Sequence, residues 1–191
     1  MTKRDSPSTL LGAGRSLGTI FQVEINGKIG GDKMGKKARE IAGVDLKDLI
    51  KDLNKAYCDE WLAYYAWWYM AQAVEGKGYE DMAEFLNKIA KDELEHATEL
   101  AERIIELGGL PTNNLSSVEK NANAPYPGVM KDLSDYDEII KLVTTAEAGA
   151  IEVYDKIAKK TFGKDHDTYQ LAVHIMGEEI THEEMFENLK G

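Results

Sequence analysis

The sequence contains four long segments in which apolar residues recur every three or four positions, and this pattern constrains the fold more than any other feature. The segments span about residues 45–75, 80–107, 135–163 and 167–189. Such spacing gives a helix one apolar face, which must be buried against other helices. Asp45 is the expected N-cap of the first helix, and Asp137 stands in a capping-box position relative to Ser134 in the third.

The connections between these segments predict how the helices are arranged. Short loops at 76–78 and near Gly163 make helices 1 and 2, and helices 3 and 4, antiparallel neighbours. A connection of roughly 25 residues between helices 2 and 3 is long enough to cross the bundle, and a short helix is expected within it at 115–121. We therefore expect an all-α fold, a four-helix bundle with one long crossover between helices 2 and 3. No stretch approaches the length of apolar chain that a membrane span needs.

Composition narrows the class of protein. Of the 191 residues, 43% are hydrophobic, which is enough for a core and excludes global disorder. The net charge of −11 disfavours binding to nucleic acid and favours the attraction of cations. Cys58 is the single cysteine, so neither an intramolecular disulfide nor a cysteine-only metal cluster can form, and a cytoplasmic setting is expected.

The first part of the chain differs in character from the rest. Residues 1–33 are rich in Gly, Ser and Thr and carry five basic and three acidic residues, whereas the rest of the chain has a net charge of −13. The alternation of apolar and polar residues over 19–25, followed by a hairpin-turn signal, is typical of a short strand. We expect residues 1–40 to form a flexible leader, with or without that strand, and residues 41–191 to form the bundle. The leader is either a mobile tail or a segment that binds a protein partner.

Each apolar face is interrupted near its middle by a carboxylate. Helices 1 and 3 each place one glutamate there, and helices 2 and 4 each place a glutamate followed three residues later by a histidine. These residues are Glu60, Glu93, His96, Glu147, Glu179 and His182. A buried carboxylate without a partner costs several kcal/mol, so four in one core need compensating cations. Two divalent metals balance four carboxylates, and this inventory is typical of di-iron and di-manganese carboxylate bundles.

Chance is a poor explanation for this pattern. Glutamate is common enough, at 20 of 191 residues, that one accidental Glu-x-x-His is unremarkable. Here two occur, and both fall in mid-helix on an apolar face. Glu60 and Glu147 precede the glutamates of the two motifs by 33 and 32 residues. Two similar helical hairpins that reach the same depth would have this spacing.

Other residues near the motifs have less specific patterns. The glutamates off the apolar faces and the two remaining histidines are expected at the surface, with capping as the alternative for the histidines. These residues are Glu95, Glu99, Glu178, His166 and His174. Tyr64 and Tyr154 are expected in the core, where a phenol could also hydrogen-bond a metal ligand or donate an electron. Cys58 is expected to be half-buried and not a ligand, and part of the aromatic run over 61–69 could face another subunit.

With these residues the chain resembles the ferritin-like superfamily and, within it, the archaeal and bacterial Dps-like ferritins. Those proteins combine a bacterioferritin-type di-iron site inside each subunit with a cage of the size formed by Dps. The resemblance covers about residues 40–190, rests on the six residues given above, and implies a ferritin-like four-helix bundle. The lone Cys58 departs from the pair of cysteines that the archaeal members usually carry.

The resemblance also implies a role for each ligand and for the protein. Glu93 and Glu179 would bridge two iron ions. The terminal ligands, one carboxylate and one imidazole on each iron, would be Glu60, His96, Glu147 and His182. The family oxidises Fe(II) with hydrogen peroxide or oxygen and stores the ferric mineral in a hollow shell, which protects against oxidative stress. The chain ends nine residues after His182, without the fifth helix usual in 24-subunit cages, so a homo-oligomeric cage of 12 subunits is favoured.

Two alternatives stay open from the sequence alone. The same six residues suit a soluble di-manganese or di-iron peroxidase or catalase that stores no iron. Alternatively, the chain could act through its leader, as a cargo protein or a DNA-associated protein. The weak positive charge of residues 1–33 makes DNA the less expected partner.

Overall fold

The computed structural model describes residues 35–189, and this part of the chain is built from helices, without a strand. The helices are α1 (Lys36–Ile41), α2 (Leu46–Ala73), α3 (Tyr79–Glu106), α4 (Leu115–Asn121), α5 (Tyr136–Thr161) and α6 (His166–Glu187). The short strand indicated at 19–25 lies outside the described residues. So do residues 1–33, for which the sequence left open a mobile tail or a segment that binds a partner. The six-residue α1 spans the boundary that the sequence placed between leader and bundle.

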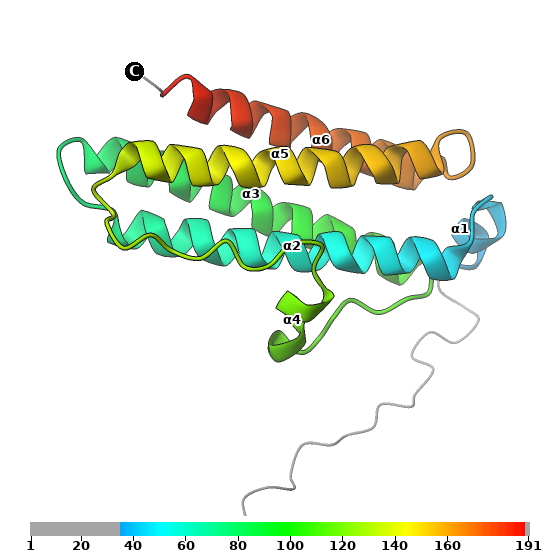
Figure 1. Cartoon of the computed structure of the whole chain (residues 1–191). Helices are drawn as coiled ribbons and strands as arrows, with labels where there is room; N and C mark the ends of the chain where they lie inside the picture. Colours follow the sequence, from blue (N-terminus) through cyan, green and yellow to red (C-terminus); the bar gives the residue numbers. More distant parts are fainter. Residues whose placement is uncertain (1–34, 190–191) are drawn as a thin grey trace, which may run out of the picture.

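The four long helices α2, α3, α5 and α6 lie side by side and form a four-helix bundle, as the sequence predicts (Figure 1). The crossover from α3 to α5 runs along α2 and carries the short helix α4 (Figure 1). Side chains of α2 hold it there. Asn54 donates to the carbonyl of Leu110 and accepts from the Thr112 amide, at 3.2 and 2.9 Å. Asp59 accepts from the backbone and side-chain nitrogens of Asn123, at 2.7 and 2.6 Å.

The ends of the helices lie within about two residues of the predicted positions, because capping residues define them. Asp45 caps α2 as expected, with its Oδ1 accepting from the Asp48 amide at 2.8 Å. The expected capping box of the third helix is wrong by one residue. Asp135 caps α5 by accepting from the Glu138 amide at 3.1 Å, while Ser134 bonds to Asp132 in the preceding turn.

One glycine is required by close packing at the start of α1. Gly35 has a φ of 64°, in the left-handed region, and a Cβ there would lie 1.9 Å from the carbonyl oxygen of Glu106 at the end of α3. A larger residue would therefore push α1 off the bundle.

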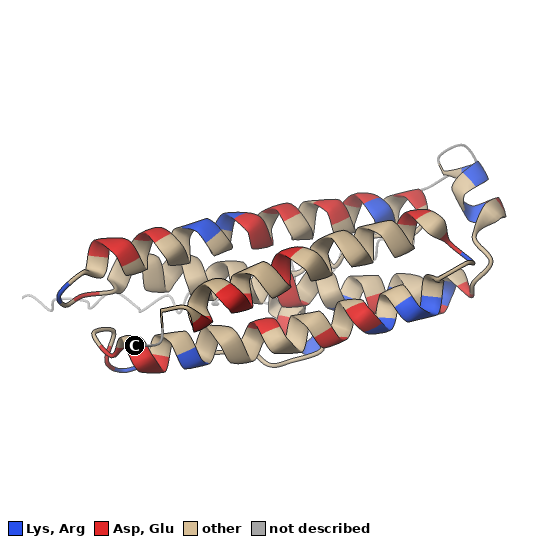
Figure 2. Cartoon of the chain, turned by 90° about the horizontal axis from the view of Figure 1, so that it is seen from above, with Lys and Arg blue, Asp and Glu red and all other residues tan. Residues whose placement is uncertain are grey.

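The core divides into two apolar clusters with a polar layer between them. One cluster includes Trp67, Met70, Leu86, Ile89, Val143 and Phe186. The other includes Leu49, Leu53, Leu100, Ile104, Ile157 and Ile175. Outside this layer, Arg103 and Asp165 are also buried. Acidic and basic positions alternate along the length of the helices (Figure 2). Among the described helices, none combines the length and the apolar character needed to cross a membrane.

Candidate metal centre

The polar layer between the two clusters consists of the six residues singled out in the sequence. Each is at most 3% exposed, and together they come from all four long helices. They form two overlapping sets, and within each set the ligand atoms lie within 4.8 Å of one another. The sets are Glu60, Glu93, His96, Glu179 and Glu93, Glu147, Glu179, His182. Glu93 and Glu179 belong to both sets, so the geometry has two adjacent centres with two shared carboxylates.

Both histidines turn the same ring nitrogen toward these carboxylates. His96 Nδ1 lies 3.0 Å from Glu179 Oε1 and 3.3 Å from Glu93 Oε2. His182 Nδ1 lies 3.4 Å from Glu179 Oε2 and 3.7 Å from Glu147 Oε2. The two rings stack, with their centroids 6.2 Å apart. Each set thus combines one imidazole nitrogen with several carboxylate oxygens, which is a donor set that suits iron or manganese.

Several of these ligand atoms are buried without a hydrogen-bond partner. They are Glu93 Oε2, His96 Nδ1, Glu147 Oε1, both carboxylate oxygens of Glu179, and His182 Nδ1. Unpartnered buried polar atoms are costly and rare in folded proteins. These unpartnered atoms belong to the two overlapping ligand sets, so the residues fit a pair of cations, which would give every one of these atoms a partner.

The pKa values of residues in this cluster show that it favours positive charge. Burial and the charges of Glu93 and Glu179 raise the pKa of Glu60, and burial and the charge of Glu93 likewise raise the pKa of Glu147. Burial lowers the pKa of His96, but the adjacent carboxylates of Glu179 and Glu93 outweigh it and raise that pKa to about 12. Positive charge, whether protons or metal ions, therefore stabilises this cluster of carboxylates.

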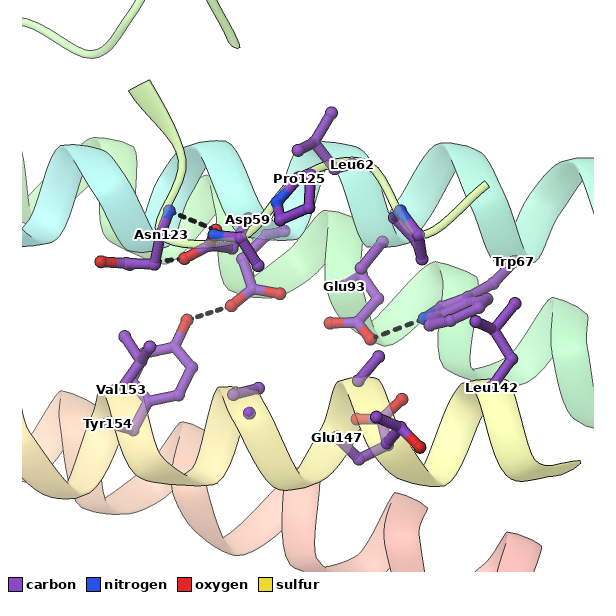
Figure 3. Close-up of a pocket in the computed structure, with 18 residues that line it drawn as sticks. Asp59, Leu62, Trp67, Glu93, Asn123, Pro125, Leu142, Glu147, Val153 and Tyr154 are labelled. Atoms are coloured by element: carbon purple, nitrogen blue, oxygen red, sulfur yellow. Dashed lines mark hydrogen bonds between the residues drawn. The ribbon is translucent and has the colours of Figure 1, made fainter. Parts of the chain in front are cut away.

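Two aromatic residues hydrogen-bond the carboxylates. The Trp67 indole nitrogen donates to Glu93 Oε1 at 3.2 Å, and the Tyr154 hydroxyl donates to Glu60 (Figure 3). Tyr154 is in the core as expected, and its phenol bonds a candidate ligand. The sequence placed Trp67 in the aromatic run over 61–69 and did not indicate Glu93 as the partner of its indole. A signal existed, because each donor lies seven residues after the lone glutamate of its own helix.

Two acidic residues on the opposite side of the histidines were also missed. His96 Nε2 lies 2.8 Å from Glu178 Oε2, and His182 Nε2 lies 3.1 Å from Asp92 Oδ2. The sequence assigned Glu178 to the surface, and its side chain is indeed 46% exposed, but its carboxylate reaches the buried ring. Each acid immediately precedes the glutamate of a Glu-x-x-His motif and contacts the histidine of the other motif.

The remaining candidates lie away from the two ligand sets. Glu95 and His166 are exposed, and His174 is exposed beside Glu99, with 3.8 Å between His174 Nε2 and Glu99 Oε1. Cys58 is fully buried rather than half-buried, and it belongs to neither set. In the aromatic run on α2, the exposed members are Tyr65, Trp68 and Tyr69.

Two overlapping carboxylate–histidine sets at the centre of a four-helix bundle define a class, the di-metal carboxylate proteins. The comparison with family models then gives the particular family. The model of the ferritin-like domain matches residues 50–191, and the chain belongs to this ferritin-like family.

Individual relatives agree with this membership. The chain is 32% identical over 150 residues to the "DNA protection during starvation protein" of Pyrococcus furiosus, covering 78% of this chain and 80% of that protein. It is 32% identical over 143 residues to a bacterioferritin of Desulfovibrio desulfuricans, covering 74% and 73%. The structure of a dodecameric thioferritin, the bacterioferritin-related protein of Bacteroides fragilis, superposes with a TM-score of 0.76 at 35% identity, covering 80% of this chain and 91% of that one. The resemblance to Dps-like ferritins found in the sequence is confirmed.

Proposed function

We propose that the protein is a ferroxidase that oxidises Fe(II) with hydrogen peroxide or oxygen at a di-iron centre inside each subunit. It stores the ferric product in a hollow homo-oligomeric cage and so protects against oxidative stress. The observation that carries this proposal is the sharing of Glu93 and Glu179 between two buried ligand sets, which brings two metal positions together. The ferritin-like family membership supports the same reading.

The proposal assigns a role to each ligand. Glu93 and Glu179 would be shared by the two ions, because they belong to both sets. Glu60 and His96 would hold one ion, and Glu147 and His182 would hold the other. Four carboxylates and two divalent ions are neutral in sum, which removes the cost of burying the charges.

The chemistry assigned to the site is a balanced two-electron reaction. Two Fe(II), one hydrogen peroxide and two protons give two Fe(III) and two waters, so each Fe(II) supplies one electron as the O–O bond breaks. The residues contribute in three ways. Carboxylates favour the harder ferric product, imidazoles also suit ferrous iron, and the apolar clusters on both sides limit access of water.

A cage of 12 subunits is the proposed assembly. The similar protein from Bacteroides fragilis is described as dodecameric. The acidic surface, with a net charge of −11, would draw iron toward such a shell.

The test is iron oxidation by the purified protein, measured by stopped-flow absorbance with peroxide under anaerobic conditions and, separately, with oxygen. We expect a fast phase that consumes two Fe(II) per chain, and an assembly of 12 chains in native mass measurement that fills with ferric iron. Glu93→Ala and His182→Ala should each abolish the fast phase, whereas Glu95→Ala, at an exposed position on α3, should not.

Three results would contradict the proposal. Unchanged rates in both ligand variants would remove the site assignment. A monomer or dimer that never forms a ferric core, or protein that is isolated with two manganese per chain and evolves oxygen from peroxide, would favour a soluble peroxidase or catalase instead.

A further inference from the structure

The two ligand sets of the metal centre are equivalent in their residue types but not in their surroundings. Each set holds one histidine and one glutamate of its own, together with the two shared glutamates. The set with Glu60 and His96 is the first position below, and the set with Glu147 and His182 is the second position. The two positions differ in the hydrogen bonds that hold their own residues and in the spacing of their donor atoms.

The glutamate of the first position is held by a hydrogen-bond donor, whereas that of the second position is not. The Tyr154 hydroxyl on α5 donates to Glu60 on α2 (Figure 3). Tyr154 is 1% exposed, so packing fixes the direction in which its hydroxyl points. In the described part of the chain, Glu147 Oε1 is buried without a partner, and Glu147 Oε2 lies 3.7 Å from His182 Nδ1, beyond hydrogen-bond distance. Only Glu60 is therefore oriented before a metal arrives.

The donor atoms of the first position also lie closer together. Within the described residues, His96 Nδ1 has oxygens of three glutamates at 3.0, 3.3 and 3.9 Å. His182 Nδ1 has oxygens of two glutamates, at 3.4 and 3.7 Å. A metal ion must bring all its ligand atoms to one point, so the first position needs less rearrangement to bind one.

The remaining contacts agree with this difference or are neutral to it. On the other ring nitrogen, His96 Nε2 lies 2.8 Å from Glu178, and His182 Nε2 lies 3.1 Å from Asp92. Each histidine thus has a carboxylate behind it, and the shorter contact belongs to the first position. The Trp67 indole donates to a shared glutamate, so it favours neither position. The Tyr154 hydroxyl is the contact that most clearly separates the two.

We propose that the two positions bind metal unequally, and that Tyr154 is the positioning residue that makes the first position the tighter one. A ligand that is already oriented loses less conformational freedom on binding, and such supporting contacts are worth about 10- to 100-fold in metal affinity. The inference rests on the proposed function and deepens it. The first position retains its ion, and the second position, whose glutamate the metal itself must order, is where Fe(II) exchanges.

The experiment is a calorimetric titration of the metal-free, full-length protein with Co(II), a divalent probe that needs no oxidant. Two cations bound side by side repel each other, so two steps in the unmodified protein would not separate the positions. Variants that leave one position intact do so, because Glu147→Gln retains the first position and Glu60→Gln retains the second. We expect a Co(II) dissociation constant at least about tenfold lower in Glu147→Gln than in Glu60→Gln.

Tyr154→Phe in each of these two backgrounds tests the positioning role. It should weaken Co(II) binding about tenfold in the Glu147→Gln background and leave it unchanged in the Glu60→Gln background. A purely structural role would weaken both positions alike. Tyr169→Phe is the matched control, because the Tyr169 ring packs on Phe162 at the connection between α5 and α6, and it should change neither constant.

The outcomes distinguish this inference from the proposed function. Equal dissociation constants in the two single-position variants, tighter binding in Glu60→Gln, or an equal loss in both backgrounds on Tyr154→Phe would overturn the inference alone. A protein that binds no Co(II) at all would overturn the inference and the proposed function together. Unequal binding in a protein that does not oxidise Fe(II) would contradict only the proposed function.

Discussion

The indole nitrogen of Trp67 on α2 donates a hydrogen bond to Glu93 Oε1 on α3, at 3.2 Å. A corresponding hydrogen bond comes from the second helical hairpin, formed by α5 and α6, because the Tyr154 hydroxyl on α5 donates to Glu60 on α2. In both cases a bulky aromatic residue, two turns beyond the glutamate of its own helix, orients a carboxylate on another helix. Hydrogen bonds of this kind fix the direction in which a carboxylate presents its lone pairs to a metal.

Removing the indole donor should weaken metal binding without unfolding the bundle. Trp67→Phe keeps an aromatic ring in the core but leaves Glu93 free to rotate. We expect an affinity for Mn(II) or Fe(II) about tenfold lower, measured by calorimetry under anaerobic conditions. Trp68→Phe is the matched control, since Trp68 is exposed on the same helix and should have no effect. Equal losses in the two variants would mean that the hydrogen bond does not orient the ligand.

Neutralising a terminal carboxylate should have opposite effects on stability and on binding. Glu60 is buried and its pKa is raised by burial and by its acidic neighbours, so its charge is unfavourable without metal. Glu60→Gln should therefore raise the melting temperature of the metal-free protein and abolish binding at one metal position. Calorimetry of both forms checks this, with Glu95→Gln as an exposed control on α3. A lower melting temperature for metal-free Glu60→Gln would show that the carboxylate has a structural role.

Much of the fold and of the candidate site follows from the sequence, because periodicity is a local property. The interruption of an apolar face by Glu93 and His96 places both residues toward the core without any knowledge of the partner helices. The long connection between the second and third helices likewise predicts the crossover. Contacts between helices are a different matter, since they depend on how the helices rotate against one another.

That is why Glu178 and Asp92 were not recognised. Each lies off the apolar face of its own helix, where a solvated position is the usual expectation, and only the packing of α3 against α6 brings each one to the histidine of the other helix.

Glu178 should support the metal site from outside. Its carboxylate accepts from His96 Nε2 at 2.8 Å, which leaves Nδ1 directed at the ligand set. Glu178→Gln should lower the rate of Fe(II) oxidation about tenfold while the assembly stays intact. Glu184→Gln, an exposed substitution on the same helix, is the control. If the two variants oxidise iron at the same rate, the contact with His96 has no role in catalysis.

The stability of the metal-free protein should fall as the pH rises above about 6.5. The pKa of His96 is raised from 6.5 to about 12 by the adjacent carboxylates, so its stabilising charge is fully present below pH 6.5 and is lost as the pH rises toward 12. The raised pKa values of Glu60 and Glu147 act in the same direction, because the folded protein holds protons that the unfolded chain releases.

Bound metal should remove most of this dependence, because it replaces the protons. Melting temperatures measured by calorimetry between pH 6.5 and pH 9 should therefore diverge, with the metal-free protein falling and the Zn(II)-loaded protein changing little. The pKa of Glu179 is lowered by His182 and His96, so its effect appears only on acidification and lies outside this range. Parallel curves for the two forms would contradict the proposed exchange of protons for metal.

A buried ion pair far along the bundle should contribute stability without affecting the metal centre. The Arg103 guanidinium donates to both carboxylate oxygens of Asp165, at 2.8 and 3.0 Å, and its Nε donates to Thr168 at 2.8 Å. Asp165 is also the N-cap of α6, so one carboxylate joins the end of α3 to the start of α6.

Arg103→Met leaves the buried Asp165 carboxylate without its cation, which should lower the free energy of unfolding by about 3–5 kcal/mol in denaturant titrations. Lys91→Met, exposed on the same helix, should change it by less than about 0.5 kcal/mol. Below its melting temperature, the Arg103→Met variant should still oxidise Fe(II) at the normal rate, because His96 lies two helical turns away from Arg103. A loss of activity in the folded variant would mean that the Arg103–Asp165 pair also sets the position of α6 at the metal centre.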